Sequence, residues 1–327
     1  MGRRSGPKRG SMQFYPRTKT KRIYPTVSSF IESEKPKLMA FPAYKAGMTH
    51  IVATENYDKA TAFGQQVAIP VTILETPEVL VFGLRLYEKT PYGMKAITEV
   101  LAEKLPKELG RKFNLPKEYK GQDKLAEAEK LIEKTAEIRA IVATQPTKID
   151  LKKTPEVLEI TIGGKDIKSQ WDYAKTVLGK EIKSTDVLSE GAWIDVTGVT
   201  RGFGTQGPVK IFGIKIQVRK AQGHRRRPGA IGAWHPNRVL YTVPMQGQYG
   251  FFKRTEYNKR ILKIGVDGKE VTPKGGFVNY GNVSSYLMVK GSVPGIRKRL
   301  LVVREALRHN KNETMPTITH ISTATQQ

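Results

Sequence analysis

The residue pattern closest to a known chemical signature is Gly202-Phe-Gly-Thr-Gln-Gly207, a G-x-G-x-x-G run of the kind found in dinucleotide-binding loops. In such loops a helix follows the glycines, and an acid about 20 residues further on binds the ribose. Here residues 208–216 are rich in β-branched side chains and are predicted to form a strand. No acid occurs between Asp195 and Glu256. The pattern therefore argues against a dinucleotide cofactor.

A different role for these glycines follows from their basic neighbours. Arg201 precedes the run and Lys210 follows it. Glycine lets the backbone approach another group closely. We predict a glycine turn that lies against a phosphate backbone.

Other catalytic and metal-binding patterns do not occur in the sequence. The chain has no cysteine, which excludes disulfides, thiolate zinc sites and cysteine nucleophiles and indicates a reducing compartment. Its five histidines are scattered, without the i, i+4 spacing of a helical metal site. Carboxylates cluster on one predicted amphipathic helix, where a solvated face explains them: Glu127, Glu129, Glu133 and Glu137. We expect no catalytic residue, no metal and no cofactor.

The segment from Val196 to Arg260 is the strongest signal in the chain. It holds thirteen Lys or Arg residues against one acid, together with ten glycines. It lacks the aliphatic periodicity needed to build a core of its own. A polyanion must neutralise such a segment, and nucleic acid is the partner that this charge favours.

The positive charge is concentrated and not spread along the chain. The 327 residues, enough for two globular units, carry 56 basic and 30 acidic side chains, a net charge of 56 − 30 = +26. Residues 1–31 contribute +8 and residues 196–260 contribute 13 − 1 = +12, whereas residues 95–190 contribute only 19 − 17 = +2. The two basic segments are therefore expected to contact the partner, and the balanced segment to face solvent or protein.

Flat rings beside the arginines favour RNA over duplex DNA. Arg225, Arg226 and Arg227 offer rigid forks to phosphates. Trp234 and His235 lie between Gly232 and Pro236, at a predicted loop tip where they can stack on unpaired bases. The alternative is that Trp234 anchors the core of its own loop.

The N-terminal residues 1–36 are predicted to form an extended basic arm. Phe14, Tyr15, Tyr24 and Phe30 are interleaved with basic residues such as Arg17. The cations can meet phosphates while the rings stack on bases or pack on the protein. The alternative is a disordered basic tail. No apolar run that would form a signal peptide or a membrane span is found.

Short β-branched and aromatic runs punctuated by Gly, Pro, Asn or Asp predict many strands and a closed or half-closed antiparallel barrel. These runs are 38–53, 66–74, 80–87, 192–199, 209–216, 260–266, 285–289 and 300–303. The charge-balanced segment between them predicts an α/β insertion. It has an amphipathic helix over 122–140, a strand over 157–162, and a helix over 169–178 with Ser169 as a cap.

Taken together, the motifs of this chain resemble the large-subunit ribosomal protein L3 family in its archaeal and eukaryotic form. The matching pieces run nearly from end to end: Lys8–Arg17, Ala43–His50, Val199–Lys210, Ile231–Pro236, Gln246–Gly250, Arg254–Lys259, Gly276–Tyr280 and Val289–Gly295. Eukaryotic members carry a modifiable histidine upstream of the Trp loop. The sequence around His224 differs from theirs, so no modification is assigned to it.

The resemblance implies a mainly β protein: a split six-stranded β-barrel of the translation-protein type with an inserted α/β domain. The expected division is a basic N-terminal arm (1–36), a barrel (37–94 with 187–217 and 261–327), an α/β insertion (95–186) and a basic internal extension with the Trp loop (218–260). The resemblance further implies a cytoplasmic, ribosome-bound scaffold that is not an enzyme and not an independent homo-oligomer. Its partners would be large-subunit rRNA and neighbouring ribosomal proteins.

In this family the protein acts early in subunit assembly, and the extension reaches toward the peptidyl-transferase region. The residues expected to bind rRNA are Arg3, Arg4, Lys8, Arg9, Arg17, Lys19, Arg22, Arg201, Lys210, Lys220, His224, Arg225, Arg226, Arg227, Trp234, His235, Arg238, Gln246, Gln248, Lys253, Arg254, Lys259 and Arg260. Alternatives from other classes are an RNA-acting enzyme or RNA chaperone that uses the same extension, and a DNA-compacting protein.

Overall fold

The chain divides into two compact units with very different charge. The computed structural model describes residues 10–116, 121–308 and 314–325. One unit combines residues 1–23 with 199–254, and the other combines 24–198 with 255–327. The first, called here the basic unit, has 8 + 11 = 19 Lys or Arg residues and no Asp or Glu. The second, called the core unit, has the remaining 56 − 19 = 37 basic and all 30 acidic residues.

A seven-stranded sheet, built mainly of antiparallel pairs of neighbouring strands, contains the runs predicted for the barrel with two exceptions. The run 80–87 lies in a second sheet, and the run 209–216 forms no strand. The order of the seven-stranded sheet is β14-β9-β12-β13-β3-β2-β15. β14 also pairs with β2, so the path of pairings returns to its start after six strands. The bounds are β2 Ala40–Thr54, β3 Gln66–Glu75, β9 Trp193–Val199, β12 Lys253–Gly265, β13 Tyr286–Lys290, β14 Leu300–Glu305 and β15 Thr317–Ile321.

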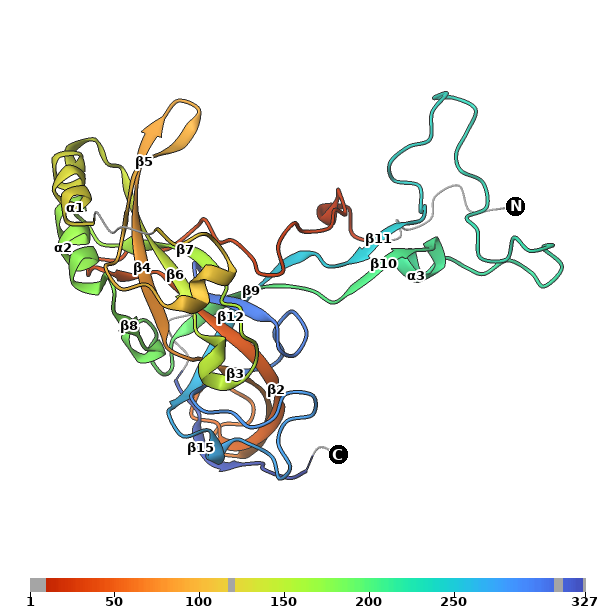
Figure 1. Cartoon of the computed structure of the whole chain (residues 1–327). Helices are drawn as coiled ribbons and strands as arrows, with labels where there is room; N and C mark the ends of the chain where they lie inside the picture. Colours follow the sequence, from red (N-terminus) through yellow and green to blue (C-terminus); the bar gives the residue numbers. More distant parts are fainter. Residues whose placement is uncertain (1–9, 117–120, 309–313, 326–327) are drawn as a thin grey trace. The chain divides into compact units, whose positions relative to one another are not determined.

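A second sheet is built largely from the charge-balanced segment. Its order is β1-β7-β6-β4-β5, and the short β8 pairs with β4. The bounds are β1 Lys37–Leu38, β4 Val79–Thr90, β5 Gly93–Leu101, β6 Glu137–Thr144, β7 Val157–Gly163 and β8 Glu181–Ile182. The helices α1 (Gly121–Lys130) and α2 (Ile167–Val177) lie together on one side of this sheet (Figure 1). Short 3-10 helices occupy Met12–Phe14, Lys107–Arg111, Ile132–Lys134, Pro146–Ile149, Ser184–Asp186 and Gly268–Glu270.

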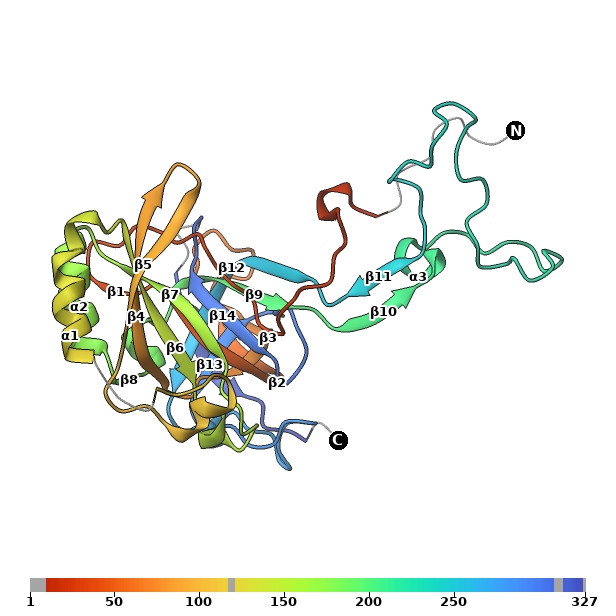
Figure 2. The same ribbon diagram turned by 45° about the horizontal axis from the view of Figure 1, so that its top comes forward.

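The two sheets of the core unit share a hydrophobic cluster. Phe41 of β2, Leu84 of β4 and Trp171 of α2 are all buried in it. A buried polar contact also joins the sheets, because the hydroxyl of Tyr44 lies 2.9 Å from Thr144 Oγ1 and donates to Glu156 over 3.2 Å. The ribbons of β2 and β6 lie close to each other in both views (Figure 2). The core unit is thus held by burial, as its apolar strands predict.

The helix predicted over 122–140 is too long. α1 ends at Lys130, and Ile138 and Ala140 lie in β6. After α1, the hydroxyl of Thr135 donates to the carbonyl of Leu131 and closes the 3-10 turn that precedes β6. The run after it is β-branched, and the neighbouring strands pair with it on both sides. Tertiary pairing therefore overrides the local helical pattern.

The second predicted helix begins earlier than expected. α2 starts at Ile167 with Asp166 in the cap position, so Ser169 is not its cap. The Ser169 hydroxyl instead donates to the carbonyl of Asp166 over 2.7 Å within the first turn. The strand predicted over 157–162 is confirmed as β7.

In the basic unit, the glycine run and the segment after it differ from the prediction. The run forms the strand β10 (Gly202–Gln206), which pairs antiparallel with β11 (Gly247–Gly250) through a bulge near Gly202. Residues 208–212 form the helix α3 and not a strand. Pro208 favours the first helical turn, and Gly213 ends the helix with a φ of 61°. α3 is only five residues long, and the ribose-binding acid of a dinucleotide site is still missing from the sequence.

The grouping into units also places residues 199–217 with the extension, whereas the division expected from the sequence placed them with the barrel.

Candidate nucleic-acid interface

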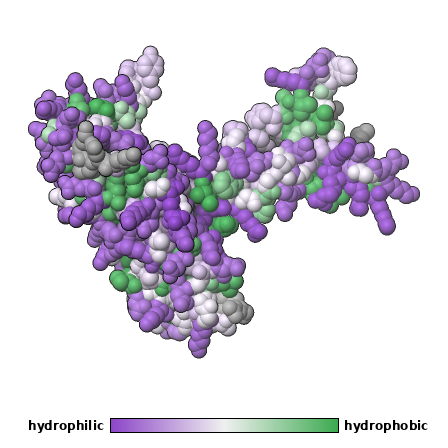
Figure 3. Space-filling model, in the orientation of Figure 1, coloured by the Kyte–Doolittle hydropathy of each residue, from purple (hydrophilic) through white to green (hydrophobic). Residues whose placement is uncertain are grey.

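The basic unit has almost no apolar interior. The three clusters of buried apolar side chains contain no residue of this unit within the described ranges. Hydrophilic residues cover much of the surface around β10, β11 and α3 (Figure 3). The residues from 214 to 246 contain no helix or strand and are mostly exposed. This unit therefore gains little stability from burial, as its composition predicts.

Contacts between the N-terminal arm and residues 251–254, between β11 and the start of β12, organise one part of the unit. The backbone N–H and the hydroxyl of Thr20 both donate to the carbonyl of Phe251, over 3.0 and 3.1 Å. The guanidinium of Arg254 lies 4.2 Å from the centre of the Phe14 ring and 5.1 Å from that of Phe252. Lys19 lies 5.6 Å from the ring of Phe251. The part of the arm that the structure describes is thus packed on the protein, which favours this alternative over a free tail.

A second group of contacts joins the arm to α3. The guanidinium of Arg17 lies 4.9 Å from the Tyr15 ring and 4.6 Å from the Phe212 ring. Tyr15 also meets Tyr241 edge-on, with 5.7 Å between ring centres. Cation–π contacts of this kind hold a guanidinium in place without neutralising it. Arg17 therefore keeps its charge for another partner.

β10 presents a similar arrangement. Arg201 and Lys210 lie 5.5 and 5.3 Å from the ring of Phe203. Phe203 in turn lies against Tyr249 of β11, with ring centres 5.3 Å apart.

The glycines of the run itself are open: among the described residues, an added Cβ would meet the Phe251 side chain at 3.4 Å at Gly202 and nothing within 4 Å at Gly204 or Gly207. Their approach to a phosphate backbone stays a prediction. A close backbone approach occurs instead at Gly250 of β11, where an added Cβ would lie 1.9 Å from the Arg201 carbonyl oxygen.

All Lys, Arg, Asp and Glu positions of this unit are basic, so its charges repel one another. Partial burial and, next, the positive charge of Arg17 lower the pKa of Arg254. No carboxylate belongs to the unit, so nothing inside it offsets this repulsion. Phosphate oxygens would remove the repulsion and accept the hydrogen bonds that these cations offer.

The tip residues are exposed. Trp234 is 84% exposed, which contradicts the alternative that it anchors the core of its own loop. Arg225, Arg226 and Arg227 are also exposed. The backbone N–H of Gln217 donates to the carbonyl of Arg225 over 2.9 Å, so two stretches of the extension lie together there.

The other predicted residues fall into three groups. Lys19, Arg22, Lys220, His224, His235, Arg238, Gln246 and Lys253 are exposed, and Gln248 is half-buried. Arg3, Arg4, Lys8 and Arg9 lie outside the described residues. Lys259 and Arg260 belong to the core unit.

These last two residues are engaged within the core unit. Lys259 pairs with Glu256 at 3.0 Å. Arg260 is 6% exposed, donates to the carbonyl of Thr314 over 2.7 Å and lies over the ring of Trp193. Burial gives Arg260 a packing role, so its inclusion among the surface contacts needs correction.

The sequence analysis missed the rings that contact the cations, which are Phe203, Phe212 and Phe251. It also missed Tyr241 and Tyr249, which pack on the rings of Tyr15 and Phe203. A signal for them was present, because several stand one or two residues from a basic residue, as in Arg201-Gly-Phe203 and Lys210-Ile-Phe212. In the described part of the chain, no group of His, Asp and Glu residues is arranged to hold a metal ion. Within the same residues, no helix is long and apolar enough to span a membrane.

Comparison with known proteins gives matches over the full length of the chain. The family model described as ribosomal protein L3 matches residues 1–327. The large ribosomal subunit protein uL3 of Methanococcus aeolicus is 50% identical over 99% of this chain and 98% of its own. The uL3 proteins of Methanocaldococcus jannaschii and Methanosphaera stadtmanae are 46% and 44% identical, and each alignment covers at least 97% of both proteins.

Proposed function

We propose that this chain, which belongs to the ribosomal protein L3 family and is a structural constituent of the large ribosomal subunit, binds large-subunit rRNA chiefly through its basic unit. The family is one of structural ribosomal proteins and not of enzymes. The observation that carries the proposal is the charge of the unit, nineteen cations with no acid. Without a core of its own, such a unit is stabilised by phosphate neutralisation.

The contact residues fall into two roles. Arg17, Arg201, Lys210 and Arg254 are held over aromatic rings, which supports fixed contacts to the RNA backbone that set the position of the unit. Trp234 and its neighbour His235 are exposed rings in an irregular segment, which supports stacking on unpaired bases. Lys259 and Arg260 are not part of this proposal.

The pairings of the seven-stranded sheet support a six-stranded barrel. Because β14 pairs with both β9 and β2, the ring of β2, β3, β13, β12, β9 and β14 has no free edge. We propose that this ring is the split barrel of the translation-protein type. The inserted α/β domain, residues 95–186, then supplies most of β5 together with β6, β7, β8, α1 and α2, and it shares the second sheet with β1 and β4 from the segment 37–94.

We further propose that the basic unit places Trp234 toward the peptidyl-transferase region and that its binding to rRNA acts early in subunit assembly. A chain of this kind works in the cytoplasm as one copy per subunit. Ordering an acid-free segment on RNA couples its folding to binding. This coupling makes the arm and the extension suited to an early step in assembly.

Sedimentation tests the proposal. The chain should sediment with large subunits after a wash in moderate salt, and recovery in the free soluble pool alone would contradict it. For isolated rRNA, the logarithm of the binding constant should fall with the logarithm of salt concentration, with a slope of about 0.7–0.9 per phosphate neutralised. Duplex DNA of the same length is the control. Equal affinity for both would favour general nucleic-acid compaction.

A further inference from the structure

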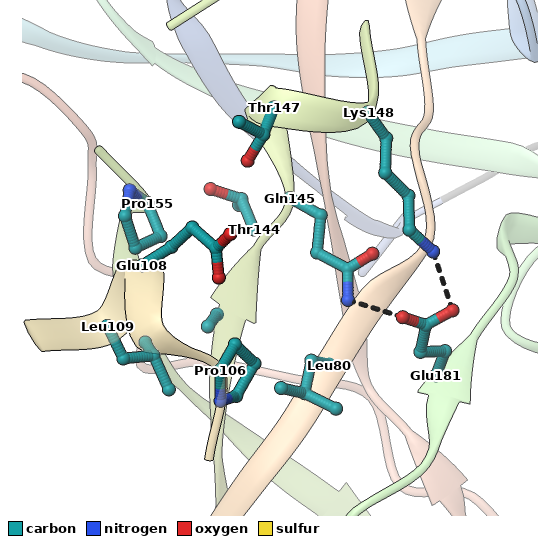
Figure 4. Close-up of a pocket in the computed structure, with 11 residues that line it drawn as sticks. Leu80, Pro106, Glu108, Leu109, Thr144, Gln145, Thr147, Lys148, Pro155 and Glu181 are labelled. Atoms are coloured by element: carbon teal, nitrogen blue, oxygen red, sulfur yellow. Dashed lines mark hydrogen bonds and ion pairs between the residues drawn. The ribbon is translucent and has the colours of Figure 1, made fainter. Parts of the chain in front are cut away.

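A second basic segment lies in the core unit, where many cations are paired with carboxylates. Lys148, for example, donates from Nζ to Glu181 over 2.6 Å (Figure 4). Residues 271–304 hold six Lys or Arg residues and no Asp or Glu, although the unit as a whole has 37 basic and 30 acidic side chains. Only carboxylates from elsewhere in the chain can therefore neutralise this segment.

The charge of the segment stays unpaired at the loop that joins β13 to β14, residues 291–299, called here the β13–β14 loop. Arg304, in β14 itself, pairs with Asp195 at 3.2 Å. Arg297 and Lys298 of the loop are exposed, and within the described ranges neither forms an ion pair. Water solvates an exposed cation, so exposure alone indicates no ligand. A partner is indicated only if the loop is held in place and its charges lie close together.

The β13–β14 loop is held on the barrel by Lys45 of β2. The ammonium of Lys45 donates to the carbonyls of Val293 and Gly295 over 2.7 and 3.2 Å. The backbone of Lys45 also bonds the loop, because its carbonyl accepts from the N–H of Lys298 over 2.8 Å and its N–H donates to the carbonyl of Arg299 over 3.2 Å. Four hydrogen bonds from one strand residue thus fix both halves of the loop.

A tight turn presents the two cations at the surface. The N–H of Arg299 donates to the carbonyl of Ile296 over 3.3 Å, and Lys298, the third residue of this turn, has a φ of 68°. Glycine or asparagine is usual in that conformation, which is costly for lysine. The guanidinium of Arg297 donates to the carbonyl of Val278 over 2.8 Å, a contact that orients the group without neutralising it. The turn therefore holds adjacent cations in defined positions.

Cations from two other strands lie close to the β13–β14 loop. Lys259 of β12 is beside Gly291, where an added Cβ would lie 3.8 Å from its Nζ. Glu256 pairs with Lys259 at 3.0 Å. Burial lowers the pKa of Lys45, while the charge of Glu256 raises it and that of Arg297 lowers it. One carboxylate thus faces several cations. Water and salt weaken the repulsion among them, whereas a polyanion replaces it by attraction.

We propose that the β13–β14 loop is a second rRNA-binding site of this chain, in which Arg297 and Lys298 contact the phosphate backbone; the inference rests on the proposed function. Phosphate oxygens accept charge-assisted hydrogen bonds from both side chains. The loop contains no aromatic residue on which a base could stack. Its contacts are therefore with the backbone and independent of RNA sequence, and they hold the core unit on the RNA separately from the basic unit.

Protein surfaces fit this loop less well than RNA. An apolar or basic surface would bury Arg297 and Lys298 without an anion, which costs free energy. An acidic surface could pair with them. It would, however, have to lie against a chain whose basic unit is already bound to RNA, and the RNA phosphates would repel it.

Lysine acetylation tests whether RNA covers the loop. The full chain, free or bound to isolated rRNA, is labelled briefly with an amine-reactive reagent, and mass spectrometry measures the rate at each lysine. The rate at Lys298 should fall by at least about ten-fold on binding, equivalent to about 1.4 kcal/mol of local contact. Lys124, exposed on α1, should react at an unchanged rate. Protection of Lys298 in intact large subunits but not on isolated rRNA would identify a protein cover and overturn the inference.

Charge-removing variants test the contact by its salt dependence. Arg297→Gln combined with Lys298→Gln should lower the slope of log binding constant against log salt by about 1–2, near one unit per phosphate contact. Lys298→Gln alone keeps the hydrogen bond of Arg297 to Val278, so the turn is preserved, and should lower the slope by about half as much. The matched pair Lys124→Gln with Lys130→Gln removes the same charge from α1 and should leave the slope unchanged.

The outcomes separate this inference from the proposed function. A wild-type slope for the double variant, or an equal fall for the matched pair on α1, would overturn the inference while rRNA binding through the basic unit stands. Failure of the wild-type chain to bind rRNA would instead overturn the proposed function.

Discussion

The guanidinium of Arg254, at the start of β12, lies 4.2 Å from the ring of Phe14 in the N-terminal arm. These residues are 240 positions apart in the sequence. Their contact joins two basic segments, although the positive charges of these segments repel each other. The ring offers its negative face to the cation, so the contact needs no acid. Aromatic rings in this unit thus take the structural place that carboxylates have elsewhere in the chain.

Replacing Phe14 by alanine should loosen the arm in the RNA-free protein. A cation–π contact at an exposed site contributes about 0.5–1 kcal/mol, so amide hydrogen exchange between residues 12 and 20 should become about two- to five-fold faster. Exchange measured by mass spectrometry checks this. The control is Lys21→Gln, which removes an exposed cation of the arm and should leave the exchange rate unchanged. Equal acceleration in both variants would show that the ring contact does not hold the arm.

Replacing Arg225, Arg226 and Arg227 together by alanine should weaken rRNA binding regardless of RNA sequence. If all three meet phosphates, the slope of log binding constant against log salt should fall by about 2–3, near one unit per contact. Filter binding over a salt series measures this slope. A matched triple variant removes Lys124, Lys130 and Lys134, which are exposed in the balanced segment. An equal fall in slope for the matched variant would mean that net charge alone decides affinity.

The two tryptophans Trp234 and Trp171 should behave in opposite ways. Trp234 is 84% exposed, so its replacement by alanine should leave the melting temperature nearly unchanged. It should weaken rRNA binding by no more than one lost stacking contact, about 1–3 kcal/mol, while altering translation at the tip. Trp171 is 2% exposed, so its replacement should cost about 3–5 kcal/mol of stability. Thermal unfolding and a translation assay on reconstituted subunits separate the two effects. Strong destabilisation by Trp234→Ala would restore the core-anchor alternative.

Tyr44→Phe tests the buried contact between the two sheets of the core unit. Tyr44 is fully buried, and burial together with the charge of Glu156 raises the pKa of its hydroxyl. Removing the hydroxyl deprives Glu156 and Thr144 of a partner and should cost about 1–3 kcal/mol in the free energy of unfolding. Tyr92→Phe, at a fully exposed ring, is the control and should cost nothing measurable by denaturant titration. Equal stability of the two variants would show that the hydroxyl contact is dispensable.

The sequence predicts most of the core unit because its strands are long apolar runs with clear turn residues. Its main error lies where distant pairing decides the outcome. Residues 137–140 continue the predicted helical pattern, but they form a strand because β4 and β7 pair with them. In the basic unit the error has a local cause. Residues 208–212 look like a strand, yet Pro208 and Gly213 define a short helix. Pro208 and Gly213 are local signals for the two ends of a helix, but the β-branched residues between them favour a strand.

For the candidate interface, charge is predictable from composition while the partners of each cation are not. The sequence shows directly that no acid lies near Arg225. It also predicts that Arg226 and Arg227 are exposed, because unpaired charges are rarely buried. That Arg17 lies over Phe212 depends on how the chain brings the arm to the extension. Likewise, Arg260 is basic like its neighbours, but it is buried against Trp193. Spacing along the chain does not distinguish a cation that packs from one that binds.

The most direct test of the account maps RNA–protein crosslinks in intact large subunits. Ultraviolet crosslinking followed by mass spectrometry identifies the residues that touch rRNA. The account predicts that the crosslinked peptides are concentrated in residues 1–23 and 199–254, including the one that contains Trp234. Crosslinks concentrated in residues 95–186, with none in the basic unit, would contradict it.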